Sequence, residues 1–159
     1  MLTRGIAVPL LAAAIGIAAC GSSSSPNSTG SGRSGTTTVA AKPIPDRTYS
    51  VGLRGSAEVP KGSPTGGGSA TIILKGVKQQ VCWTFRLSGL PKPTAAHIHF
   101  ARAGAAGPIL IPLGAPYAAT GCVSMVPRPE LALIEASPSR YYVNVHTASY
   151  PNGAVRGQL

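Results

Sequence analysis

The chain has 159 residues, of which 43% are hydrophobic and only 11% charged, and its 14 lysines and arginines against 4 acidic residues give a formal net charge of +10. So few carboxylates exclude the acidic clusters of Ca²⁺ loops, Mg²⁺-dependent phosphotransferases and most glycosidases. The 20 glycines and 15 prolines argue against a helix bundle and favour short strands joined by many turns.

The first nineteen residues have the pattern of a secretory signal peptide. One cation, Arg4, precedes an uncharged run over residues 5–19, which is shorter than the about 20 apolar residues of a membrane span. The run ends in Ile17-Ala18-Ala19-Cys20, which resembles the bacterial lipobox, where the cysteine thiol is lipidated and becomes the first mature residue. We therefore expect a lipoprotein signal peptide over 1–19 and lipidation of Cys20. The alternative is an ordinary signal peptide with an incidental cysteine.

Residues 20–47 form the expected tether. The stretch 21–38 is almost wholly glycine, serine and threonine, which cannot bury apolar surface and favours a flexible linker. Stable anchoring takes more than one acyl chain, such as palmitate, and a lipoprotein cysteine normally carries several. These features predict an envelope lipoprotein that is anchored in the cell membrane and exposed on its extracytoplasmic face.

The positive charge is scattered along the chain. There is no run of four or more cations and no interleaving with aromatic residues. A nucleic-acid partner is therefore not expected, and a location outside the cytoplasm would not suit one. A basic surface instead favours anionic lipid headgroups, an acidic cell-wall polymer or another envelope protein as the partner.

From about residue 48 the chain alternates between apolar and polar residues, as strands do. Strands are expected over 48–54, 69–75, 80–87, 95–100, 108–113, 120–126, 140–147 and 154–159, with one helix over 129–136. Asn152-Gly153 is expected to reverse the chain between the last two strands. Seven or eight short strands with turns between them predict an all-β, antiparallel β-sandwich of the immunoglobulin or superoxide dismutase type with one short helix.

Several segments together resemble the CHRD domain, a family named after chordin and common in bacterial secreted proteins and lipoproteins. They are 53–60 (LRGSAEVP), 87–90 (LSGL), 96–99 (AHIH), 142–147 (YVNVHT) and 151–159 (PNGAVRGQL). The resemblance covers about residues 48–159. Two departures are Ala154, where the family often has an acidic residue, and the segment 100–102. The resemblance implies the domain and carries no activity with it.

Two cysteines remain once Cys20 is assigned to lipid, namely Cys82 and Cys122. An oxidising compartment and an even count favour a disulfide between them. It would close a loop of about 40 residues and contribute about 4 kcal/mol in the chain-entropy description. The alternative is a pair of buried free thiols.

All three histidines of the chain fall inside the quoted segments. His97 and His99 are two residues apart on one strand and share a face, whereas His146 lies on another strand. Three imidazoles that meet can hold Cu or Zn, for which nitrogen is a preferred ligand. The alternative is that they are structural and tie loops to strands through hydrogen bonds.

The pattern His-x-His followed by a later lone histidine also resembles copper–zinc superoxide dismutase. The chain lacks the further histidines and the aspartate of a second metal site, since Asp46 precedes the domain, and dismutase activity is rejected. No other catalytic set is present in the sequence, so an enzyme is not expected. The leading hypothesis is a non-enzymatic binding or scaffolding module without a cofactor. The alternative is a Cu/Zn-binding domain of the envelope.

Overall fold

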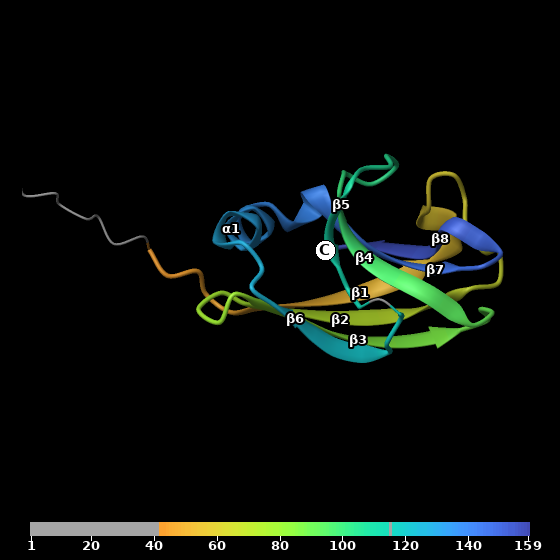
Figure 1. Ribbon diagram of the computed structural model, residues 1–159. Helices are drawn as coiled ribbons and strands as arrows, with labels where there is room; N and C mark the ends of the chain where they lie inside the picture. The colour runs from red at the N-terminus through yellow and green to blue at the C-terminus, as the bar shows by residue number, and fades with distance from the viewer. Residues whose placement is uncertain (1–41, 115) are drawn as a thin grey trace, which may run out of the picture. The chain divides into compact units, whose positions relative to one another are not determined.

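The computed structural model describes residues 42–114 and 116–159 (Figure 1). The expected signal peptide, Cys20 and the tether up to residue 41 lie outside the described residues. Eight antiparallel strands form one sheet in the order β5-β4-β7-β8-β1-β2-β3-β6. The strands are β1 (Arg47–Arg54), β2 (Gly67–Lys75), β3 (Gln80–Ser88), β4 (Pro93–Phe100), β5 (Ile109–Pro112), β6 (Thr120–Ser124), β7 (Tyr141–Thr147) and β8 (Tyr150–Gln158). The expected all-β fold is confirmed.

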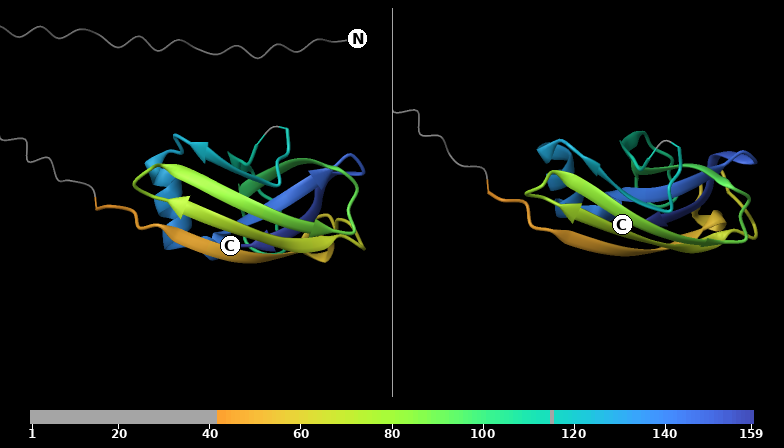
Figure 2. Two further views of the ribbon diagram at one scale, coloured as in Figure 1. Left: turned by 90° about the horizontal axis from the view of Figure 1, so that it is seen from below. Right: turned by 60° about the horizontal axis from the view of Figure 1, so that its bottom comes forward.

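The sheet bends over on itself and makes two layers, one of β6, β3, β2 and β1 and the other of β8, β7, β4 and β5 (Figure 2). The layers join at β1 and β8, whose register holds a single pair, Arg54 opposite Arg156. The remaining edges, β5 and β6, are not hydrogen-bonded to each other. The result is a nearly closed sandwich.

The core lies between the two layers and follows from the alternation of apolar residues along the strands. From one layer it receives Ile72, Leu74, Val81, Trp83 and Phe85, and from the other Ile98, Val143, Val145 and Val155. Helix α1 (Arg128–Ala136) buries Leu131 and Ile134 against the end of the sandwich. The expected helix is thus present. Among the described residues, no helix is long and apolar enough to cross a bilayer.

The folded unit includes residues just before the expected domain start at Thr48. Ile44 is buried and belongs to the core cluster. Asp46 accepts a hydrogen bond from the amide of Gly76 at 3.0 Å through its Oδ1 atom, and Arg47 is the first residue of β1. These contacts attach the last residues before Thr48 to the β2–β3 turn.

The chain reversal before the last strand lies four residues earlier than the sequence predicted. Thr147 pairs with Tyr150, and the Thr147 hydroxyl accepts the Tyr150 amide at 3.2 Å, so Ala148 and Ser149 form the turn. The Asn-Gly pair instead lies inside β8, where Gly153 has φ +131°. Asn-Gly was therefore a misleading turn signal, because the left-handed glycine here serves a packing contact described below.

Two short 3₁₀ segments, η1 (Gly55–Ala57) and η2 (Pro138–Arg140), precede a loop and β7 respectively. The expected disulfide between Cys82 and Cys122 is present. The two cysteines lie directly opposite each other on β3 and β6. The bridge therefore fastens the edge strand β6 to its only neighbour in the sheet.

Candidate metal centre

The three histidines share the outer face of the layer formed by β4 and β7. His97 lies opposite Asn144 and His99 opposite Tyr142, while His146 lies opposite Ala95. Because neighbouring side chains along a strand alternate between faces, the intervening Ile98, Val143 and Val145 fill the core. The sequence prediction that His97 and His99 share a face is confirmed, and the register brings His146 beside them.

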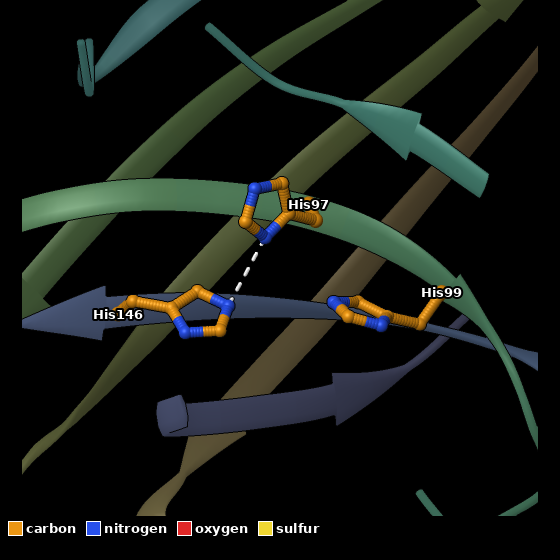
Figure 3. A group of neighbouring side chains, drawn as sticks. All are labelled: His97, His99 and His146. Atoms are coloured by element: carbon orange, nitrogen blue, oxygen red, sulfur yellow. Dashed lines mark hydrogen bonds between the residues drawn. The ribbon is translucent and has the colours of Figure 1, made fainter. Parts of the chain in front are cut away.

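The imidazoles converge (Figure 3). The Nδ1 atom of His97 and the Nε2 atom of His146 are 3.0 Å apart. One ring nitrogen of each of the three histidines lies within 4.8 Å of those of the other two. The ring of His99 directs a nitrogen toward His146 in the same view. His99 is buried, whereas His97 and His146 are half-buried and leave one side of the cluster open.

Backbone carbonyls fix two of the rings. His146 Nδ1 lies 2.9 Å from the carbonyl oxygen of Pro151, and His99 Nδ1 lies 2.9 Å from that of Gly107. A carbonyl oxygen only accepts, so both Nδ1 atoms carry a proton and donate it. In neutral imidazoles this leaves the lone pair on Nε2 of each ring. Metal-binding histidines are oriented by the same kind of outer hydrogen bond.

The two Nε2 lone pairs differ in what they meet. His146 Nε2 faces His97 Nδ1 and also lies 3.1 Å from Asn144 Oδ1. His99 Nε2 is buried and has no hydrogen-bond partner. An unsatisfied buried acceptor costs about 1–3 kcal/mol and calls for a ligand or another explanation. The cluster therefore contains a buried nitrogen lone pair ready to bind an electrophile.

The spacing of His97 and His146 is close to that of two ligands on one ion. Two nitrogens bound at about 2.0–2.1 Å to a tetrahedral Zn²⁺ lie about 3.3 Å apart. The observed 3.0 Å separation thus needs only a small change. His97 Nδ1 must lose its proton to Nε2 of the same ring, because both facing atoms have to present lone pairs. The three residues present fit a divalent metal with nitrogen ligands.

Asn144 and Glu58 lie behind the histidines. Asn144 is 1% exposed, and its side-chain Oδ1 atom lies 3.1 Å from His146 Nε2. Glu58 is 4% exposed, and its Oε1 atom has no hydrogen-bond partner. Its carboxylate packs on Gly153, where a Cβ would overlap it. Burial raises the pKa of Glu58, against the opposing effects of Asn144 and Arg156.

A stack of three side chains supports His99 from the other side. The ring of Tyr142 lies parallel to that of His99 at 4.7 Å, and the guanidinium of Arg156 lies 3.4 Å above the centre of the Tyr142 ring. Arg156 donates to the carbonyls of Ala105 and Arg102 at 2.7 and 2.9 Å. The loop that supplies the Gly107 carbonyl to His99 is therefore held by Arg156.

The environment disfavours protonation of His97 and His99. Burial, followed by the charges of His146 and His99, lowers the pKa of His97 from its ordinary 6.5 to about 4. Burial likewise lowers the pKa of His99. Neutral imidazole is the form that binds metals. At neutral pH His97 and His99 are thus in the form that a metal requires.

Sequence reasoning did not find the residues around the histidines. Asn144 and Tyr142 alternate with buried valines, which is the usual pattern of a solvent-facing strand side. Glu58 and Arg156 carry charges, which ordinarily indicate exposed positions. Their burial comes from loops that fold back over the outer face, and the retained order of the family segments was the only available signal. Trp83 and Phe85 are in the core as expected.

The comparison with known families yields one match. The family model of the CHRD domain matches residues 49–159, which include every side chain of the cluster. The chain belongs to the CHRD family. No curated protein and no solved structure matches it. The CHRD match identifies the domain and assigns no chemistry to the histidine cluster.

Proposed function

We propose that this CHRD domain binds one divalent transition-metal ion, Zn²⁺ or Cu²⁺, through His97, His99 and His146. The observation that carries the proposal is the buried, unpartnered Nε2 lone pair of His99. Its ring is oriented by the Gly107 carbonyl, and it lies beside two further imidazoles whose nitrogens are within 4.8 Å. A purely structural histidine would have both of its ring nitrogens satisfied.

The ion would have three protein ligands and an open side facing solvent. Bound Zn²⁺ or Cu²⁺ supplies a Lewis acid at that position. The chain itself holds the rings of His146 and His99 in place through the carbonyls of Pro151 and Gly107, and burial keeps His97 and His99 neutral. We propose binding of the ion without catalysis, which fits the scarcity of carboxylates in the chain.

Metal titration tests this proposal. We expect one equivalent of Zn²⁺ or Cu²⁺ per chain by elemental analysis, and in the Cu²⁺ form an electron paramagnetic resonance spectrum with nitrogen hyperfine coupling. His97→Ala and His146→Ala should each weaken binding at least a hundredfold. At a metal concentration about 100 times the dissociation constant, the ion should stabilise the fold by about 2.7 kcal/mol.

The matched control is Thr84→Ala, which truncates an exposed residue on β3 in the other layer. It should bind the metal like the unaltered chain. Circular dichroism of each metal-free variant checks that it has folded. A chain that folds, keeps its disulfide and takes up no Zn²⁺ or Cu²⁺ would contradict the proposal. The domain would then be a binding or scaffolding module without a metal.

We also propose that the protein is a bacterial lipoprotein, anchored at Cys20 on the extracytoplasmic face of the cell membrane. The lipobox-like segment supports this, and so does the Cys82–Cys122 disulfide, because disulfides persist in oxidising compartments. Labelled palmitate should be incorporated into the unaltered chain and not into Cys20→Ser. Incorporation that survives Cys20→Ser, or none at all, would reject the anchor.

A further inference from the structure

A pocket with basic walls lies at the end of β1. It has a volume of about 570 Å³ and is lined by Arg54, Lys61 and the glycine- and serine-rich segments between them. Arg54 and Lys61 are both exposed. The walls are fixed in place, since the Gly62 amide donates to the Gly55 carbonyl at 2.9 Å and the Ser63 amide to that of Ala154 at 2.8 Å. The pocket is therefore preformed.

A second basic pocket lies at the end of β4. It has a volume of about 230 Å³ and is lined by Arg102 and Arg140 together with Phe100, Ala101 and Ala105. Arg102 and Arg140 are exposed, and the Arg140 guanidinium lies 4.9 Å from the centre of the Phe100 ring. An apolar ring and two cations thus border the same hollow.

Arg156 links the two pockets. It lies directly opposite Arg54 across β1 and β8, and it bonds to the carbonyl of Arg102. Arg156 is itself 2% exposed, so an anion would contact the exposed cations of the two pockets and not the Arg156 guanidinium. The loops that carry the two pockets rise on the same side of β7 and β8 in Figure 1. We call Arg54, Lys61, Arg102, Arg140 and Arg156 the basic band.

Negative charge is almost absent from the basic band. The whole chain has four acidic residues. Glu130 and Glu135 lie on α1, and Asp46 is bonded to the β2–β3 turn. Glu58 is buried next to Arg156 and offsets that charge. Four exposed cations therefore remain, and the one salt bridge found among the described residues, between Arg47 and Glu135, is elsewhere.

We infer that the basic band binds an extended phosphate-bearing polymer, whose successive phosphates occupy the two pockets. Two separate basic hollows suit a chain with repeated anionic groups, whereas a flat bilayer surface could touch only their rims. Arginine and lysine both pair with phosphate oxygens. The inference does not depend on the proposed metal, because none of the five cations is a histidine ligand.

The test measures binding of long-chain inorganic polyphosphate to the full, metal-free chain by isothermal titration calorimetry. Arg54→Gln/Lys61→Gln and Arg102→Gln/Arg140→Gln each remove two charges from one pocket. Each pair should weaken binding about tenfold at low salt. The matched control, Lys75→Gln/Lys78→Gln, removes the same charge at the opposite end of β1 and should change binding less than twofold. Thermal melting verifies that every variant is folded.

Two further measurements compare polyphosphate with inorganic phosphate and with the phosphate groups of lipid vesicles. Inorganic phosphate at equal total phosphate should not compete, because it cannot occupy both pockets at once. Binding should weaken as salt is raised. The inference is overturned if polyphosphate does not bind, or if the pocket variants behave like the control. It is also overturned if they lower binding to phosphatidylglycerol vesicles more than binding to polyphosphate.

Discussion

Gly153 lies in β8 at a position where a side chain would not fit. A Cβ there would overlap the Glu58 carboxylate, and the backbone has φ +131°. Gly153→Ala should therefore lower the free energy of unfolding by about 2–4 kcal/mol, since it adds backbone strain and displaces a buried charge. Chemical denaturation measures this change.

Gly52 on β1 is the natural comparison, because nothing lies within 4 Å of where its Cβ would be. Gly52→Ala should be neutral or stabilising by up to about 1 kcal/mol. Equal effects of the two substitutions would show that the contact between Glu58 and Gly153 does not constrain β8.

The histidines also make the stability of the metal-free chain depend on pH. The pKa of His97 is about 4 when folded and 6.5 when unfolded, so between these values the unfolded chain binds more protons. The stability from His97 is complete above pH 6.5 and is lost as pH falls toward 4. The lowered pKa of His99 acts in the same direction. Denaturation midpoints measured across this range should decrease on acidification.

Glu58 changes the stability of the folded chain with pH in the opposite direction to His97. Its pKa is raised by burial, so the folded chain binds the extra proton above pH 4.5, and acidification through this range is stabilising. Glu58→Gln removes that contribution. The loss of stability between pH 6.5 and 4 should then become steeper than in the unaltered chain. An unchanged slope would mean that the pKa of Glu58 is the same in the folded and the unfolded chain.

At the scale of elements, the 101–107 loop depends on Arg156. Its guanidinium donates to the carbonyls of Ala105 and Arg102 and to Gln158, and it is 2% exposed. Lysine cannot reproduce this planar set of donors. Arg156→Lys should cost about 1–3 kcal/mol and accelerate amide hydrogen exchange in the loop. Arg86→Lys, at an exposed position of β3, should do neither.

Most of the elements could be predicted from periodicity. Val81, Trp83 and Phe85 alternate with polar residues and are buried as the pattern indicated. The helix followed from Pro129 and Glu130 at its start. The Asn152-Gly153 reversal was wrong, because the left-handed glycine that marks a turn serves here to admit a carboxylate from a loop almost a hundred residues earlier.

The candidate site was predictable only in part. Strand alternation placed His97 and His99 on one face, but the position of His146 depends on a register that one sequence does not reveal. The carbonyls of Gly107 and Pro151 orient the rings through backbone geometry and leave no mark in residue identity. The basic band gathers cations from β1, β8, η2 and two loops, which in the sequence are only scattered charges.

For the whole molecule, the disulfide fastens β6 to the sandwich. The replacement of both Cys82 and Cys122 by serine should lower the free energy of unfolding by about 2–4 kcal/mol. Metal uptake should persist, because the histidines lie in the other layer. A reducing agent should destabilise the unaltered chain by a similar amount and leave the double variant unchanged. Loss of metal uptake on reduction alone would show that the two layers are coupled.

The disulfide joins residues 82 and 122, while a metal at the cluster would join residues 97, 99 and 146. The two closures interleave along the chain, so neither loop lies inside the other. Residues 99–122 would belong to both rings, and opening one ring would leave that shared segment tethered through the other. A denatured chain that kept both links would be a doubly looped, compact coil, from which refolding starts with β6 already near β3 and β4 already near β7.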